Sequence, residues 1–163
     1  MKFRLLATAL SLSAAGLVGI ALHEGYTGHA VVPVRGDVPT VGFGTTRNED
    51  GSPVRMGQTT TPPKALALLL ADASRAQQAV ARCTKVPMTQ QQFDQLLSLA
   101  YNIGEGAFCS STLVRKLNAG DCHGAAAEFS RWNKVRGRVV AGLVQRRAEE
   151  RRKFEEDCDG PAR

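Results

Sequence analysis

Several common signatures are missing from this 163-residue sequence. It has no internal repeat, no zinc-finger spacing and no aromatic motif of the RNA-binding kind, which argues against repeat architectures and common nucleic-acid-binding modules. None of its four cysteines forms a CxxC pair, so a cysteine-bound metal is not expected. Aromatic residues make up only 6%, with one tryptophan, Trp132, which we interpret as a core residue rather than a sugar-binding platform.

Strongly apolar segments are also scarce. The uncharged run at 5–22 has 18 residues, the lower limit for spanning a bilayer, and Ala, Gly, Ser and Thr fill ten of them. Lys2 and Arg4 precede the run, so the rest of the chain is expected to be exported. The run is either a cleaved signal peptide or a retained anchor. We favour an uncleaved segment, residues 1–23, that first anchors the chain weakly and later becomes the helix presenting Glu24.

Basic residues outnumber acidic ones by 21 to 15, which gives a net charge of +6. This balance favours a polyanionic partner such as nucleic acid, anionic lipid or an acidic wall polymer. The densest basic segment alternates with glutamates, so it is predicted to be a solvated helix face with ion pairs such as Glu149–Lys153 rather than a nucleic-acid stripe. Its basic members are Arg146, Arg147, Arg151, Arg152 and Lys153.

The four cysteines, Cys83, Cys109, Cys122 and Cys158, all lie in the second half of the chain. An even number in an exported protein indicates two disulfides, for which three pairings are possible. We favour Cys83–Cys109 and Cys122–Cys158, because these would tie the end of one predicted helix to the start of another.

The remaining pattern predicts a small β-containing lobe followed by a larger helical lobe, with a polymer-binding cleft between them. Short strands are expected at 31–34, 38–43 and 54–56, with a turn at 48–53. Helices are expected from Pro62 to about Cys83 and from a Thr89–Gln92 capping box to Asn102, with a break at Gly104 and Gly106. Three more should follow, at about 109–119, 122–132 and 139–157.

Two polar residues follow the apolar run and carry the chemical interpretation. Glu24 comes directly after it, and Thr40 stands in a Gly-rich turn. A carboxyl group at the end of an apolar helix, facing a polar turn, is typical of the acids that cleave glycosidic bonds. His23 and His29 flank Glu24, but five residues separate them, so the spacing of a zinc-peptidase HExxH motif is absent.

These residues belong to a larger set of motifs by which the chain resembles phage lysozymes of glycoside hydrolase family 24, especially endolysins with a signal-anchor-release segment. The resemblance covers nearly the whole chain. Its motifs lie at 23–25, 39–45, 101–104, 107–108, 111–121, 129–132 and 142–149. The resemblance implies an α+β lysozyme-like fold for residues 24–163, with Glu24 as general acid and Thr40 helping to position a water. It also implies that Tyr101, Asn102 and Gly104 line the substrate cleft.

One family residue is not matched. The aspartate expected about nine residues after the glutamate falls on Pro33, next to Val34, and Asp37 is the nearest carboxylate. Either Asp37 takes the water-positioning role from a shifted loop, or it is only a turn residue and Glu24 and Thr40 work alone. Without an aspartate, attack by the 6-hydroxyl of the substrate becomes plausible, which would make the enzyme a lytic transglycosylase.

The resemblance thus implies a monomeric muramidase that cuts β-1,4 bonds between N-acetylmuramic acid and N-acetylglucosamine in peptidoglycan, without a metal or organic cofactor. The expected location is the periplasm, at first tethered to the inner membrane by residues 5–22. A catalytically inactive wall-binding protein and a nucleic-acid-binding protein are the competing classes, and export argues against the second.

Overall fold

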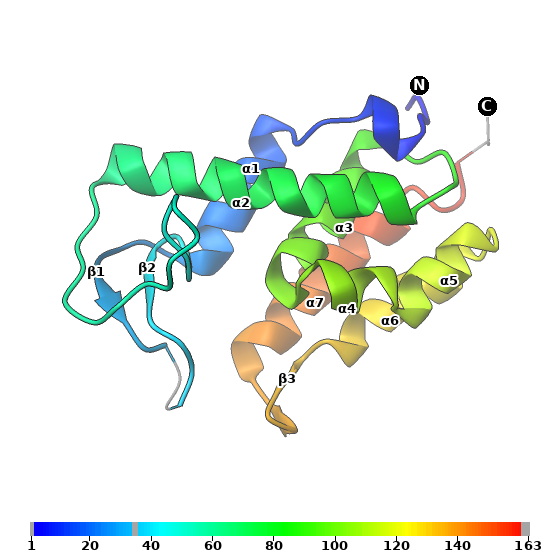
Figure 1. Ribbon diagram of the computed structural model, residues 1–163. Coiled ribbons are helices and arrows are strands. Elements are labelled where there is room, and N and C mark those ends of the chain that lie inside the picture. Colours follow the sequence, from blue (N-terminus) through cyan, green and yellow to red (C-terminus); the bar gives the residue numbers. More distant parts are fainter. Residues whose placement is uncertain (1, 34–35, 161–163) are drawn as a thin grey trace. The chain divides into compact units, whose positions relative to one another are not determined.

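A computed structural model describes residues 2–33 and 36–160 (Figure 1). The chain divides into two compact units, Leu17–Ser74 and a second unit that combines Met1–Gly16 with Arg75–Arg163. The helices and the small antiparallel sheets make it α+β, as predicted.

The smaller unit contains most of helix α1 (Ala14–Glu24), strands β1 (Thr27–Val31) and β2 (Thr40–Gly42), and the first part of α2 (Pro62–Cys83). The strands pair antiparallel with Thr27 opposite Gly42 and Val31 opposite Thr40. Gly42 has a φ of 67° and approaches α2 so closely that an added Cβ would lie 2.8 Å from the Cβ of Ala65. Glycine therefore allows β2 to pack directly on α2.

The strand predictions were only partly correct. The first strand covers Thr27–Val31 instead of 31–34, of which Val34 lies outside the described residues. The second is shorter than 38–43 because Pro39 has no N–H to donate to the ladder. Residues 54–56 do not form a strand; Val54 is instead buried with Ala30 and Val41 in a small core.

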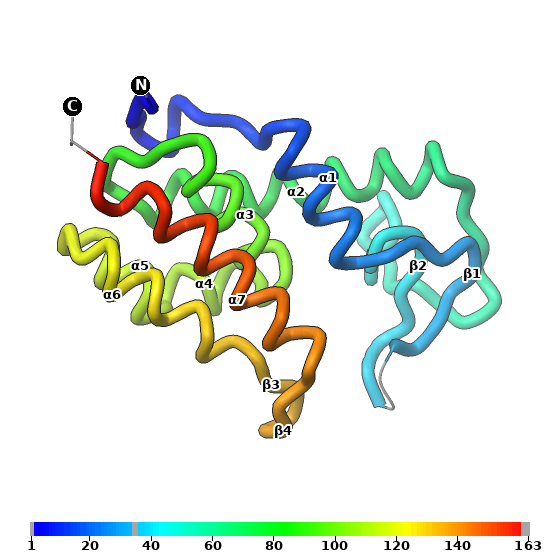
Figure 2. The backbone as a smooth tube through the Cα atoms, turned by 180° about the vertical axis from the view of Figure 1, so that it is seen from behind, coloured from blue at the N-terminus to red at the C-terminus, as the bar shows by residue number. Residues whose placement is uncertain are grey.

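The larger unit contains α3 (Gln90–Ile103), α4 (Glu105–Cys109), α5 (Thr112–Asn118), α6 (Cys122–Glu128) and α7 (Ala141–Glu155). α7 packs along α3, and α5 packs against α6 (Figures 1 and 2). The predicted capping box is confirmed: Thr89 accepts from the Gln92 backbone N–H, and the Gln92 side chain accepts from the Thr89 N–H. The resulting core is rich in phenylalanine, and the rings of Phe129 and Phe154 lie 5.5 Å apart.

Helix boundaries in this unit differ from the prediction where caps compete. Gly104, with a φ of 86°, ends α3, but α4 starts at the next residue instead of a loop. α5 begins after Ser111, whose Oγ accepts from the Val114 N–H, and not at Cys109. α6 gives way to a 3₁₀ turn, η2 (Phe129–Arg131). The hairpin of β3 (Lys134–Val135) and β4 (Arg138–Val139) was not predicted.

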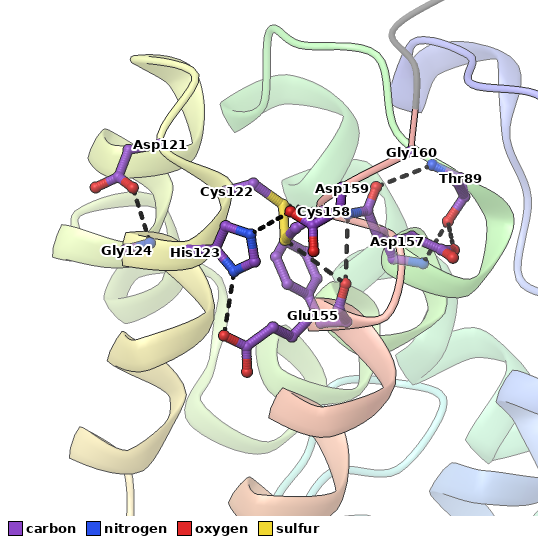
Figure 3. Close-up of a disulfide and its surroundings, with 12 residues drawn as sticks. Thr89, Asp121, Cys122, His123, Gly124, Glu155, Asp157, Cys158, Asp159 and Gly160 are labelled. Atoms are coloured by element: carbon purple, nitrogen blue, oxygen red, sulfur yellow. Dashed lines mark hydrogen bonds and ion pairs between the residues drawn. A yellow bond between two sulfur atoms is a disulfide. The ribbon is translucent and has the colours of Figure 1, made fainter.

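Both predicted disulfides are confirmed, Cys83–Cys109 and Cys122–Cys158. The first links the end of α2 to the end of α4, so the expectation that it would reach a helix start is wrong. The second links the start of α6 to the turn after α7 (Figure 3).

The prediction of a solvated basic face on α7 is wrong for two of its residues. Arg146 is 5% exposed and Arg147 is 1% exposed. Glu150 compensates both charges, with its Oε1 3.1 Å from Arg146 Nε and its Oε2 2.9 Å from Arg147 Nε, and Ser98 Oγ donates to it at 2.7 Å. Burial raises the pKa of Glu150, and the two guanidinium groups oppose that shift. The more exposed Lys153 does pair with Glu149, as predicted.

The apolar run at 5–22 is divided in this structure. It forms a 3₁₀ turn, η1 (Ala7–Ala9), then an extended stretch, then the greater part of α1. No helix within residues 2–33 and 36–160 is both long and apolar enough to cross a membrane.

Candidate active site

Glu24 is the last residue of α1, so the helix presents its side chain at the C-terminal end as predicted. Gly25 follows with a φ of 67°, and its N–H donates to the Ala21 carbonyl at 3.0 Å. A left-handed glycine directly after a helix satisfies a free carbonyl and turns the chain sharply away. Glu24 is consequently half-buried at a helix end whose direction is fixed.

The carboxylate of Glu24 lies against the backbone of Gly44. A Cβ built on Gly44 would be 2.8 Å from Glu24 Oε2 and 3.6 Å from its Cδ, so any other residue there would displace the carboxylate. Gly44 also has a φ of 79°, which disfavours residues with a side chain. Two independent requirements therefore select glycine at position 44, and one of them is the space needed by Glu24.

The turn that carries Gly44 follows directly on β2. Val41 and Thr45 bond to each other in both directions, with N···O distances of 3.0 and 3.1 Å, so the chain reverses over residues 42–44. Thr45 is 1% exposed, and its Oγ1 donates to Asp72 on α2 at 3.3 Å. This hydrogen bond and the Gly42 contact hold the turn against α2 and thereby keep Gly44 beside Glu24.

Thr40 begins β2, two residues before Gly42, where this turn starts. It is half-buried, and its Oγ1 donates to the Val31 carbonyl at 3.5 Å, across the strand pair. The same short segment therefore carries Thr40 at its start and the glycine that receives Glu24 at its end. The structure places both predicted residues in one unit and on adjoining elements.

An aromatic pair flanks the contact between Glu24 and Gly44. Tyr26 and Phe43 pack at an angle of 55° with ring centroids 5.5 Å apart. Tyr26 is two residues after Glu24 and Phe43 is next to Gly44, so the ring contact ties the chain after α1 to the turn. Tyr26 Oη also donates to the Thr60 carbonyl at 3.4 Å.

Asp37 lies in an exposed loop between β1 and β2, three residues before Thr40. Its Oδ1 accepts a hydrogen bond from the Val38 N–H at 2.9 Å. This bond joins neighbouring residues and is local to the loop. The other oxygen and the exposed position leave the carboxylate accessible to solvent.

The three residues expected to contact substrate belong to the helical unit. Tyr101 and Asn102 occupy the last turn of α3, where Tyr101 is half-buried and Asn102 is exposed. Gly104 is exposed between α3 and α4, and its N–H donates to the Ala100 carbonyl at 2.9 Å. The sharp change of direction at Gly104 leaves the Asn102 amide at a solvent-facing helix end.

The two histidines near Glu24 are placed on different elements. His23 is in α1, whereas His29 is exposed in β1. Among residues 2–33 and 36–160, histidine, cysteine and acidic side chains do not gather in any group of three or more that could hold a metal ion.

Gly44 and Thr45 are the positioning residues that sequence reasoning missed. Both stood within a recognised motif, but they received no role. A usable signal was the second glycine of the Gly42-Phe43-Gly44 turn, since two glycines so close together indicate either repeated positive φ or close approach by another group.

Known proteins resemble this chain over most of its length. The family model described as "Phage lysozyme" matches residues 21–150. The endolysin of Bacillus phage B103 is 42% identical over 146 residues, covering 89% of this chain but 54% of the relative, so the chain spans about half of that relative's length. The SAR-endolysin of Enterobacteria phage P21 is 32% identical, with 88% of this chain and 86% of the relative covered.

Among solved structures, an endolysin from Escherichia coli O157:H7 phage FAHEc1 superposes with a TM-score of 0.81 at 37% identity. The match covers 93% of this chain and 96% of that one. The family model spans Glu24, strands β1 and β2, the turn that carries Gly44 and most of the helical unit, so the chain belongs to the phage lysozyme family.

Proposed function

We propose that the protein is an endolysin, a muramidase that hydrolyses β-1,4 bonds between N-acetylmuramic acid and N-acetylglucosamine in bacterial peptidoglycan. The observation that carries the proposal is the seating of the Glu24 carboxylate on Gly44, beside the strand that begins with Thr40. A general acid must be held rigidly to protonate a leaving oxygen, and this one is held by a helix end and a glycine turn.

In the proposed reaction, Glu24 donates its proton to the glycosidic oxygen as the bond to the anomeric carbon breaks. A water adds to the opposite face of the sugar, which inverts the configuration. Thr40 helps to place that water through its hydroxyl. Asp37 accepts the proton of the water if the loop brings its free oxygen to the substrate. Tyr101, Asn102 and Gly104 are proposed to contact the glycan, with the Asn102 amide bonding to N-acetyl groups.

The test of the acid is Glu24→Gln. The amide has nearly the same shape and can occupy the same place over Gly44, but it cannot donate the proton. We expect the variant to keep the thermal stability of the wild type and to lose peptidoglycan hydrolysis by at least about 10²-fold. Substantial hydrolysis by a folded Glu24→Gln variant would contradict the assignment, and a protein that binds walls without cutting them would show no difference.

The role of Asp37 is tested by weighing the released sugars. Hydrated reducing ends from the wild type that are lost in Asp37→Asn would identify Asp37 as the water-positioning carboxylate. Hydrated ends from both proteins would leave Glu24 and Thr40 as the working pair. Because Pro33 stands at the spacing of the family aspartate, a transglycosylase is the alternative, and its products would be lighter by one water.

We further propose that residues 5–22 first tether the chain to the inner membrane, with the enzyme in the periplasm, and are then released. The basic flank, the 18-residue uncharged run and the relative named a SAR-endolysin support this. In the membrane, Glu24 would lie at the lipid boundary, and the helix that carries it could not place its carboxylate against Gly44. Replacing Ala and Gly by Leu within 5–22 should strengthen the tether and delay lysis. Lysis on the normal schedule would disprove the release step.

A further inference from the structure

We propose that the helical unit carries a docking surface for the chain's own N-terminal arm, and that Asp157 is its anchor. The N-terminal arm is residues 2–13, and the docking surface consists of Gln77, Met88, Gln90, Asp94 and Asp157. The inference rests on the proposed tether, because it identifies what receives the arm after the arm leaves the membrane.

Asp157 binds the start of the arm. Its side chain is almost fully buried, and Oδ1 accepts from Lys2 Nζ at 2.6 Å. The Asp157 carbonyl accepts from the Arg4 guanidinium, which also donates to the Gly160 carbonyl at 3.4 Å. Both basic side chains that precede the apolar run therefore donate hydrogen bonds to Asp157. Figures 1 and 2 show the start of the chain beside the end of α7.

The centre of the arm is held by backbone hydrogen bonds. The Leu5 N–H donates to the Met88 carbonyl at 2.9 Å, and the Met88 N–H donates back to Leu5 at 2.8 Å. Ala7, which follows, is 2% exposed. Met88 lies directly before Thr89, so the arm pairs with the segment that leads into α3.

The far end of the arm is bound by side chains of α2 and α3. The Leu12 N–H donates to Gln77 Oε1 at 2.9 Å. Asp94 accepts from the Ser13 N–H at 3.2 Å and from Ser13 Oγ at 2.5 Å. Gln90 Nε2 donates to the Ser11 carbonyl at 2.8 Å and to Asp94 Oδ1 at 3.0 Å. The arm is thus bound at its start, centre and end.

Residues 5–13 cannot occupy the membrane and this surface at the same time. Their withdrawal takes the Lys2 ammonium from Asp157 and the Ser13 hydroxyl from Asp94, two carboxylates that are only 4% and 6% exposed. Each carboxylate accepts a hydrogen bond from the arm, and hydrogen bonds to a charged acceptor are stronger than neutral ones. These bonds stabilise the docked state, in competition with a segment that lipid holds weakly.

The anchor is also coupled to α3. Asp157 Oδ2 accepts from Thr89 Oγ1 at 2.5 Å, and Thr89 is the N-cap of α3 (Figure 3). The same carboxylate consequently joins the arm, the α3 cap and the turn after α7. An arm with an uncharged second residue should dock less tightly, although its apolar part is unchanged.

The test uses the full-length purified protein and measures hydrogen exchange over residues 2–13 by mass spectrometry. Asp157→Asn removes the anchoring charge, and Lys2→Met removes its partner without touching Thr89. The control is Asp159→Asn, an exposed carboxylate two residues away that contacts His123 instead of the arm. We expect both test variants to exchange roughly tenfold faster over the arm, while the control stays within about twofold.

Cell fractionation completes the experiment. Lys2→Met keeps Arg4 as a basic flank, so export should persist. More of the Asp157→Asn protein should remain with the membrane than of Asp159→Asn. Unchanged arm exchange in both test variants would overturn the docking proposal, and so would a change in Asp157→Asn alone, which would mean that only the Thr89 bond matters. If the wild-type protein is never found in the membrane fraction, the proposed tether is refuted. Hydrogen exchange over residues 2–13 would still test the docking proposal by itself.

Discussion

Replacing Gly44 with alanine should misplace Glu24 while leaving the protein folded. The new methyl group would lie 2.8 Å from Glu24 Oε2, whereas ordinary contacts begin near 3.4 Å. The carboxylate is the free end of a side chain, so it can move aside with little disturbance of the backbone. It would have to move by at least about 0.6 Å, and a displacement near 1 Å can cost roughly 10²-fold in rate. We therefore expect kcat/KM for peptidoglycan to fall about 10- to 100-fold.

The same substitution also strains the backbone, because Gly44 has a φ of 79°. A side chain in this region costs roughly 1–2 kcal/mol. For a chain of this length, that cost lowers Tm by roughly 2–8 °C. Gly51→Ala is the matched control, since Gly51 has a φ of 81° and no atom within 4 Å of an added Cβ. It should lose comparable stability and keep its activity.

The assay is the clearing of a peptidoglycan suspension well below Tm, with Tm measured for each variant by calorimetry. The reasoning is refuted if Gly44→Ala hydrolyses within about twofold of wild type, since the displacement estimate predicts a larger loss. It is also refuted if Gly51→Ala loses as much activity as Gly44→Ala, because backbone strain alone would then explain the effect.

Three further predictions concern the helical unit. Replacing both cysteines of the Cys122–Cys158 disulfide, which closes a loop with a sequence separation of 36, should cost about 3–4 kcal/mol, seen as a lower midpoint in urea. Glu150→Ala should lower the free energy of unfolding by about 3–5 kcal/mol in the same measurement, because two buried guanidinium groups lose their counter-charge. Its control is Lys153→Ala on the same helix, which should change the free energy of unfolding by less than about 0.5 kcal/mol. A hydrogen bond to Asp159, and secondly one to Glu155, raises the pKa of His123 above 6.5. The stability that His123 contributes is therefore complete below pH 6.5 and is lost as the pH rises through the folded pKa. His123→Gln should make Tm depend less on pH between about 6 and 8, and an unchanged profile of Tm against pH would contradict this.

Local sequence signals predicted the parts of the fold that depend on nearby residues. The capping box at Thr89 and the end of α1 at Glu24 involve groups within one helical turn of each other, so composition and spacing identify them. Strand limits were less predictable, since Pro39 and Gly42 each shorten β2 for reasons of hydrogen bonding and packing.

The charges on α7 show where spacing was misleading. An alternation of arginine and glutamate is compatible with a solvated face, and Glu149 and Lys153 do form such a pair. Arg146 and Arg147 are instead buried and paired with Glu150 of the same helix, and Arg146 also donates to Ser98 of α3. The buried pair Arg146–Glu150 and the more exposed pair Glu149–Lys153 have the same i,i+4 spacing. Which side of a charged helix faces the core depends instead on the neighbouring helix.

The sequence by itself determined the family and identified Glu24 and Thr40 as candidate site residues, because motif order is a property of the chain. The cysteine positions indicated two disulfides, and the structure decided among the three pairings in favour of the expected one. Tertiary structure alone decided that Gly44 makes room for the Glu24 carboxylate, that Thr45 and Asp72 hold the turn, and that the arm ends on Asp157. The physical reason is that these contacts join residues up to 155 positions apart, and their energy depends on distance and burial that no local pattern records.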